Sequence, residues 1–170
     1  LKEEIQQEAL TRNLSGYSRF INYLPEWSGK VLDYSKISVK NKLNRFAVHR
    51  FFEIFEDTLL GDRIHSWIPN ENTKVVKHPK FYFFDNGVMN GIDRNYQPLG
   101  DRLGVCCETI IYNQIKALLS YKNVPFKISF FRTHTGIEVD FIAEFGKNIL
   151  AIEVKATDRL SADDVRYLKM

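Results

Sequence analysis

The sequence predicts a mixed α/β chain in which a helical region precedes an α/β region. Three observations support this fold class. Apolar residues recur at helical spacing after Asn44, charged and aliphatic residues alternate over 136–141 and 152–155, and the turn-forming run 69–72 lies between these patterns. We therefore expect one region over residues 1–72 and a second over residues 73–170.

The composition is that of a folded globular protein rather than a disordered, secreted or membrane-embedded one. The 170 residues are 44% hydrophobic, which is enough for a sizeable core. The two cysteines, Cys106 and Cys107, are adjacent and cannot staple distant segments, so we expect a reduced, cytoplasmic location. No apolar run approaches the roughly 18 residues that a membrane-spanning helix needs, and no membrane association is expected.

The first region is expected to contain one long helix. Apolar residues three or four positions apart define its buried face: Val48, Phe51, Phe52, Phe55 and Leu59. Asn44 is a suitable N-cap, and Gly61 is expected to end the helix. Residues 62–68 then read as a strand.

Helices followed by strands are also typical of a winged-helix module, and basic residues gather around the start of the long helix. We predict that four of them contact nucleic acid: Lys40, Lys42, Arg45 and Arg50. The alternative is that this cluster is an ordinary solvated surface. Carboxylates later in the same helix, such as Glu53 and Asp57, would repel DNA, so only its first half could face a phosphate backbone.

The second region is expected to alternate strands and helices. The run 81–84 reads as a strand and Asp85–Gly87 as a turn, followed by a helix over 104–115 and a strand over 127–133. Near the end of the chain, Ser161 is a suitable N-cap for a last helix. Two aspartates follow it in the expected first turn.

The most informative feature is a predicted β-hairpin with charged residues on one face. Side chains alternate along a strand, so Glu138 and Asp140 share one face, and Glu153 and Lys155 share a face on the next strand. The loop 144–148 contains Gly and Asn and suits a hairpin turn. The hairpin would bring Asp140, Glu153 and Lys155 together.

Two carboxylates and an ammonium group suit a magnesium-dependent phosphodiesterase. Mg²⁺ prefers oxygen ligands and uses one or two protein carboxylates, for which Asp140 and Glu153 are candidates, with the carbonyl of Val154 as a third oxygen. Lys155 would orient a water or stabilise the charged transition state. The alternative is that the alternating charges mark only a half-exposed antiparallel strand.

The hairpin with its preceding helix resembles the PD-(D/E)XK nuclease superfamily. The resemblance implies a restriction-endonuclease-like α-β-β-β-α core, and it assigns Glu108 in the helix before the hairpin as a further catalytic residue. Four segments resemble, more narrowly, the uncharacterised domain found after the ATPase core of many prokaryotic AAA+ ATPases: 51–61, 77–88, 131–140 and 151–156. This resemblance covers nearly the whole chain.

The resemblance implies the C-terminal part of an AAA+ ATPase. ATP would bind only in an upstream domain, because the chain has no G-x-x-x-x-G-K-[ST] phosphate loop, and the superfamily core is expected to be incomplete at the C-terminus. The leading hypothesis is Mg²⁺-dependent DNA cleavage. The competing hypothesis is a non-catalytic module that binds DNA or protein and directs the ATPase.

Overall fold

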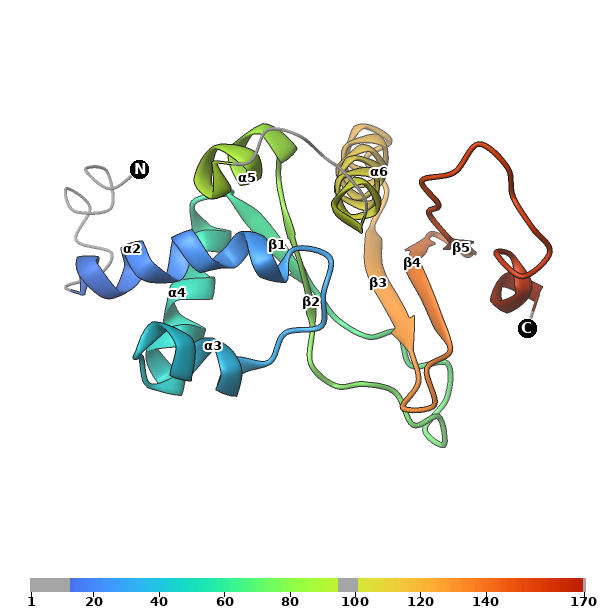
Figure 1. The fold of residues 1–170 in the computed structure, drawn as a ribbon. Coiled ribbons are helices and arrows are strands. Elements are labelled where there is room, and N and C mark those ends of the chain that lie inside the picture. The colour runs from blue at the N-terminus through green and yellow to red at the C-terminus, as the bar shows by residue number, and fades with distance from the viewer. Residues whose placement is uncertain (1–12, 95–100, 170) are drawn as a thin grey trace.

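The computed structural model describes residues 13–94 and 101–169. The described residues form five α-helices, two short 3₁₀ helices and two antiparallel sheets, which confirms the mixed α/β class (Figure 1). In chain order the elements are α2 (Leu14–Tyr23), η1 (Leu24–Trp27), α3 (Tyr34–Asn41), α4 (Arg45–Asp57), β1 (Gly61–Ile64), β2 (Lys80–Phe83), α5 (Asn86–Asp93), α6 (Asp101–Tyr121), β3 (Phe126–Arg132), β4 (Glu138–Phe145), β5 (Asn148–Ile152) and η2 (Arg166–Lys169).

The helices of the first region pack around an aromatic cluster. α4 supplies the largest share of it, and the rings of Phe20 and Phe52 meet edge to face with centroids 4.9 Å apart. The predicted cap of this helix is confirmed, because the Asn44 side chain accepts a hydrogen bond of 2.7 Å from the backbone N–H of Ala47.

The predicted end of this helix is wrong. α4 stops at Asp57, the Thr58 hydroxyl donates to the Ile54 carbonyl (2.8 Å), and Leu59 takes a left-handed conformation with its side chain 77% exposed. Gly61 instead begins β1, where a Cβ atom would lie 2.5 Å from the carbonyl oxygen of Tyr82. The glycine is therefore explained by a close strand approach and not by helix termination.

Strand β2 is buried on both faces and lies at the centre of the molecule (Figure 1). It pairs antiparallel with β1, so that Gly61 faces Phe83 and Ile64 faces Lys80. Phe81 and Phe83 belong to the helical cluster, while Tyr82 packs on the other side against Tyr112 and Phe141. The β1–β2 pairing therefore joins residues before and after position 72. The domain boundary expected at this position stays a prediction.

The structure also corrects the expected turn after β2. Asp85–Gly87 begins a helix, because the Asp85 side chain accepts from the backbone N–H of Val88 (2.9 Å) and caps α5. Aspartate is common both in turns and at helix N-caps, so its presence alone did not distinguish a turn from the start of a helix.

The β3–β4–β5 sheet contains the predicted hairpin. β4 pairs antiparallel with β5, from Phe141 opposite Ile152 to Phe145 opposite Asn148, and Gly146 in the connecting turn has a φ of 57°. This register confirms the hairpin. The chain after β1 runs beside β3, where the backbone N–H of Trp67 donates to the Phe130 carbonyl (2.6 Å).

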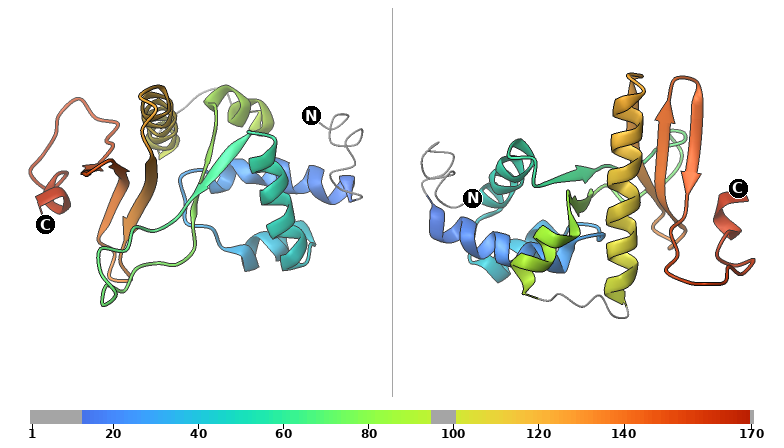
Figure 2. Two further views of the ribbon diagram at one scale, coloured as in Figure 1. Left: turned by 180° about the vertical axis from the view of Figure 1, so that it is seen from behind. Right: turned by 90° about the horizontal axis from the view of Figure 1, so that it is seen from above.

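Helix α6 lies between the helical region and this sheet (Figure 2) and contacts β2, β3 and β4. Its 21 residues contain and extend the predicted helix over 104–115. Within the described ranges, no helix is both long enough and apolar enough to cross a membrane.

The expected last helix is only partly formed. The Ser161 hydroxyl donates to the Asp164 side chain (2.6 Å) and accepts from the Asp164 backbone N–H, as in a helix N-terminus. The residues that follow form turns and then the 3₁₀ helix η2, not an α-helix.

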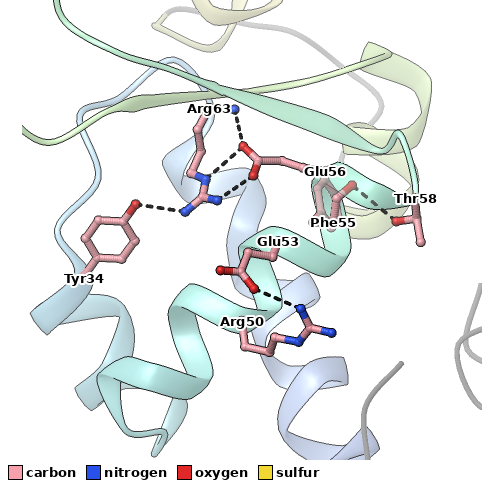
Figure 3. Close-up of polar contacts among 7 residues, drawn as sticks. All are labelled: Tyr34, Arg50, Glu53, Phe55, Glu56, Thr58 and Arg63. Atoms are coloured by element: carbon pink, nitrogen blue, oxygen red, sulfur yellow. Dashed lines mark hydrogen bonds and ion pairs between the residues drawn. The ribbon is translucent and has the colours of Figure 1, made fainter. Parts of the chain in front are cut away.

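A half-buried ion pair joins α4 to β1 (Figure 3). Glu56 accepts three hydrogen bonds from Arg63: one from its backbone N–H and two from its guanidinium group. The guanidinium also donates to the Tyr34 hydroxyl (3.3 Å). Its pKa is raised by these hydrogen bonds, although burial opposes the shift, so Arg63 stays charged and needs its carboxylate partner.

We expect Glu56→Gln to lower the free energy of unfolding by about 2 kcal/mol, because it leaves the half-buried Arg63 without its charged partner. Glu53→Gln is the matched control, since the Arg50–Glu53 pair three residues earlier is exposed and is expected to contribute less than about 1 kcal/mol (Figure 3). Urea unfolding of both variants measures the difference. Equal losses would contradict a structural role for the Glu56–Arg63 pair.

Candidate active site

One cavity brings the four predicted catalytic residues together. It has a volume of about 510 Å³ and is lined by Glu108, Asp140, Glu153 and Lys155. The walls come from the segment 29–30, from β2, α6, β3 and β4, and from the chain after β5. Residues from distant parts of the sequence therefore face one space, while their catalytic roles stay predictions.

Asp140 anchors the chain that follows the hairpin. It lies on β4 with 7% of the residue exposed, and its Oδ2 accepts a hydrogen bond of 2.9 Å from the backbone N–H of Val154. Strand β5 ends at Ile152. Glu153 and Lys155 therefore follow the strand, whereas the sequence predicted that they belong to it. The Asp140–Val154 bond holds this segment beside β4.

Glu153 and Lys155 form an ion pair, in which Lys155 Nζ lies 2.6 Å from Glu153 Oε1. Burial raises the pKa of Glu153, and the nearby charge of Asp140 raises it further, against the effect of Lys155. The hydrogen bond to Glu153 raises the pKa of Lys155, which keeps the ammonium charged. The pair thus presents a fixed cation beside two carboxylates.

Glu108 reaches the cavity from α6. Its Oε2 accepts a hydrogen bond of 2.7 Å from the Tyr82 hydroxyl, and a Cβ atom on Gly29 would lie 3.4 Å from the same oxygen. Gly29 has a φ of 72°, a conformation that favours glycine. Burial raises the pKa of Glu108 to about 7, although Lys80 opposes the shift.

Sequence reasoning missed the central cation of the cavity. Lys80, on β2, is 2% exposed, and its Nζ lies 2.6 Å from Glu138 Oε1 and 3.8 Å from Asp140 Oδ1. Arg132 pairs with the other oxygen of Glu138 at 3.2 Å. The run Lys80–Phe83 contained a signal for this lysine. Lys80 and Tyr82 alternate with two phenylalanines along the strand, so Lys80 and Tyr82 share one face.

The cavity lining is acidic overall. Its formal charges are carried by six acidic residues (Glu108, Glu138, Asp140, Glu153, Asp163, Asp164) and four basic ones (Lys30, Lys80, Arg132, Lys155). Among the described residues, no three or more Asp, Glu, His or Cys side chains form a group able to hold one metal ion. Two carboxylates with hard oxygen atoms nevertheless fit Mg²⁺, which keeps most of its waters.

The predicted nucleic-acid contacts lie elsewhere, on the surface of α3 and α4. All four residues are exposed, and none lines the cavity. Arg45 donates to the Ser35 hydroxyl (2.8 Å), Arg50 pairs with Glu53, and the Lys40 ammonium lies 5.8 Å from the Tyr23 ring centroid. Lys42 caps α3 in a left-handed conformation. Their role in binding DNA stays a prediction.

Comparison with known protein families divides the chain near residue 100. Residues 1–98, more than half of the 170, match the family described as Domain of unknown function (DUF8612). The chain belongs to the DUF8612 family. Residues 103–170 match Domain of unknown function (DUF4143), a domain typically found C-terminal to AAA-ATPase domains. Lys80 therefore lies in the DUF8612 part, while Glu108, Asp140, Glu153 and Lys155 lie in the DUF4143 part.

Two curated relatives come from mycobacteria. They are the "Uncharacterized protein Rv2008c" of Mycobacterium tuberculosis and the "Uncharacterized protein Mb2031c" of Mycobacterium bovis, each 22% identical over 138 residues. The match covers 79% of this chain but 30% of each relative, so the chain spans under a third of their length. No solved structure matches the chain.

The raised pKa of Glu108 predicts a pH-dependent cost in stability. An acid whose pKa rises from 4.5 to about 7 on folding binds more protons when folded, so stability falls as the pH rises through that window. Glu108→Gln removes this pH-dependent loss of stability, because glutamine does not ionise. We expect the variant to gain on the order of 2 kcal/mol relative to wild type between pH 5 and pH 8.

Urea unfolding at both pH values measures this difference. Glu71→Gln, in an exposed loop, is the control and should follow wild type. A Glu108→Gln variant whose difference from wild type is the same at both pH values would show that Glu108 ionises freely in the folded protein.

Proposed function

We propose that this chain is the C-terminal part of an AAA+ ATPase and that its cavity is a Mg²⁺-dependent site for cleavage of DNA. The observation that carries the proposal is the convergence of Glu108, Asp140, Glu153 and Lys155 on one cavity. The DUF4143 match supports the association with an ATPase. The proposed architecture is a winged-helix-like helical region followed by a restriction-endonuclease-like core.

Each residue has a role that its surroundings permit. Asp140 and Glu153 would hold the metal, which when bound supplies a more acidic water and neutralises charge on a phosphate. Lys155, fixed by Glu153, would stabilise negative charge on the phosphodiester. Glu108 has Oε2 engaged by Tyr82, which leaves Oε1 to exchange a proton near neutral pH.

In the full-length parent protein with Mg²⁺, we expect Asp140→Ala and Glu153→Ala each to abolish DNA cleavage, since each removes a metal ligand. Lys155→Ala should leave metal binding intact and slow cleavage by about 10²–10³-fold, the usual cost of losing an electrostatic contact to the transition state. Single-turnover cleavage of labelled single- and double-stranded DNA, with and without ATP, measures these effects.

Glu71→Ala is the matched control, because it removes an exposed carboxylate outside the cavity. It should cleave like wild type. The nuclease proposal fails if wild type and Asp140→Ala behave alike on every DNA substrate tested.

A second candidate function is a non-catalytic module that binds DNA and directs the ATPase. Two observations favour it: Lys80 already supplies a cation to Asp140, and Phe46 is 81% exposed within the basic cluster of α3 and α4. An exposed aromatic ring that follows Arg45 in the chain offers a surface on which a base can stack.

If this surface binds nucleic acid, Arg45→Ala and Arg50→Ala should each weaken binding on all sequences and lower the salt slope by about one unit. Phe46→Ala should weaken binding to single strands without changing that slope. Fluorescence anisotropy over a range of salt concentrations measures both quantities. Lys147→Ala, in the distant β4–β5 turn, is the control, and the same behaviour in all four variants would make the cluster ordinary surface.

A further inference from the structure

Lys80 is the most buried charged residue of the cavity lining, and the proposed chemistry gives it no role. Its side chain is 3% exposed, and its ammonium lies between Glu138 and Asp140 and 5.6 Å from the ring centroid of Phe130. β2 carries it from inside the molecule, with both faces of the strand covered. A lysine is seldom buried in this way unless it is paired.

Three carboxylates of the cavity, Glu138, Asp140 and Glu153, have a cation within ion-pair distance. Lys155 pairs with Glu153, and Arg132 shares Glu138 with Lys80. For Asp140 the only cation within ion-pair distance among the described residues is Lys80, at 3.8 Å. The proposed function also assigns Asp140 as a metal ligand. Lys80 therefore lies next to the place where the metal would bind.

We propose that Lys80 acts as the built-in counter-ion of the cavity and lowers its affinity for divalent cations. The inference rests on the proposed function, because it takes Asp140 as a metal ligand. A divalent ion on Asp140 would lie within a few ångströms of the ammonium, and like charges at that distance repel strongly where water is excluded. The ion must therefore bind against a resident positive charge.

The ammonium has little room to withdraw from such an ion. The side chain is 3% exposed and the ring of Phe130 lies under the ammonium, while the backbone of Lys80 is held between Val31 and β1. The flexible stem that usually lets a lysine reach solvent is enclosed here. We therefore expect weak metal binding in wild type, with Lys80 as the cause.

The test is calorimetric titration of Mg²⁺ and Mn²⁺ into the nucleotide-free full-length parent protein. We expect Lys80→Gln and Lys80→Met to bind either ion roughly tenfold more tightly than wild type, because the repulsive charge is gone. Lys80→Arg keeps the charge and should not gain affinity. Lys116→Met, which breaks a similar ion pair with Asp62 outside the cavity, should bind like wild type.

A choice of variant and one double variant keep the test decisive. Gln can still donate a hydrogen bond to Glu138, so Lys80→Gln is the variant to use if thermal unfolding shows that Lys80→Met does not fold. Adding Asp140→Asn to Lys80→Gln should abolish the gain, and this double variant accounts for ions bound elsewhere in the protein.

The outcomes separate the two proposals. Metal binding in wild type that is unchanged or weakened by Lys80→Gln overturns the counter-ion role and leaves the proposed function standing. Binding by Lys80→Gln but not by wild type supports the counter-ion role and overturns the metal-dependent nuclease. Absence of binding in both overturns both.

Discussion

The structure depends on one strand that is buried on both faces. β2 places Phe81 and Phe83 in the aromatic cluster of the helical region and Tyr82 against α6 and β4. Its close pairing with β1 requires Gly61, where any side chain would strike the Tyr82 carbonyl. The same strand carries Lys80 into the cavity, so the packing that joins the two regions also determines the electrostatics of the candidate site.

Most of the charged groups at the centre of that site have a partner before any ligand enters. Ion pairs and hydrogen bonds hold Asp140, Glu153 and Glu138 in place, and the Tyr82 hydroxyl holds Glu108. Such preorganisation suits catalysis, because charged groups then need not rearrange during the reaction. It suits a binding module equally well, so the fixed positions of these groups do not choose between the two candidate functions.

Sequence reasoning predicted the features that depend on local signals. The Asn44 cap and the β4–β5 hairpin follow from short-range chemistry, and the predicted convergence of Asp140, Glu153 and Lys155 follows from the hairpin. Glu108 came from a family resemblance, since nothing in its own helix marks it. Two of the local errors also have clear physical reasons. Asp85 suits a cap as well as a turn, and Gly61 serves a strand approach that helix periodicity cannot reveal. Lys80 escaped prediction because its partners lie more than fifty residues away.

The central claim is that Asp140 and Glu153 face one cavity and share one metal ion, and a crystal structure of the full-length protein soaked with Mn²⁺ tests it most directly. The account predicts an anomalous peak in the cavity within ligand distance of both carboxylates, with Lys80 still beside Asp140. Carboxylates of Asp140 and Glu153 on opposite faces of the sheet, or manganese bound only at other sites, would contradict it.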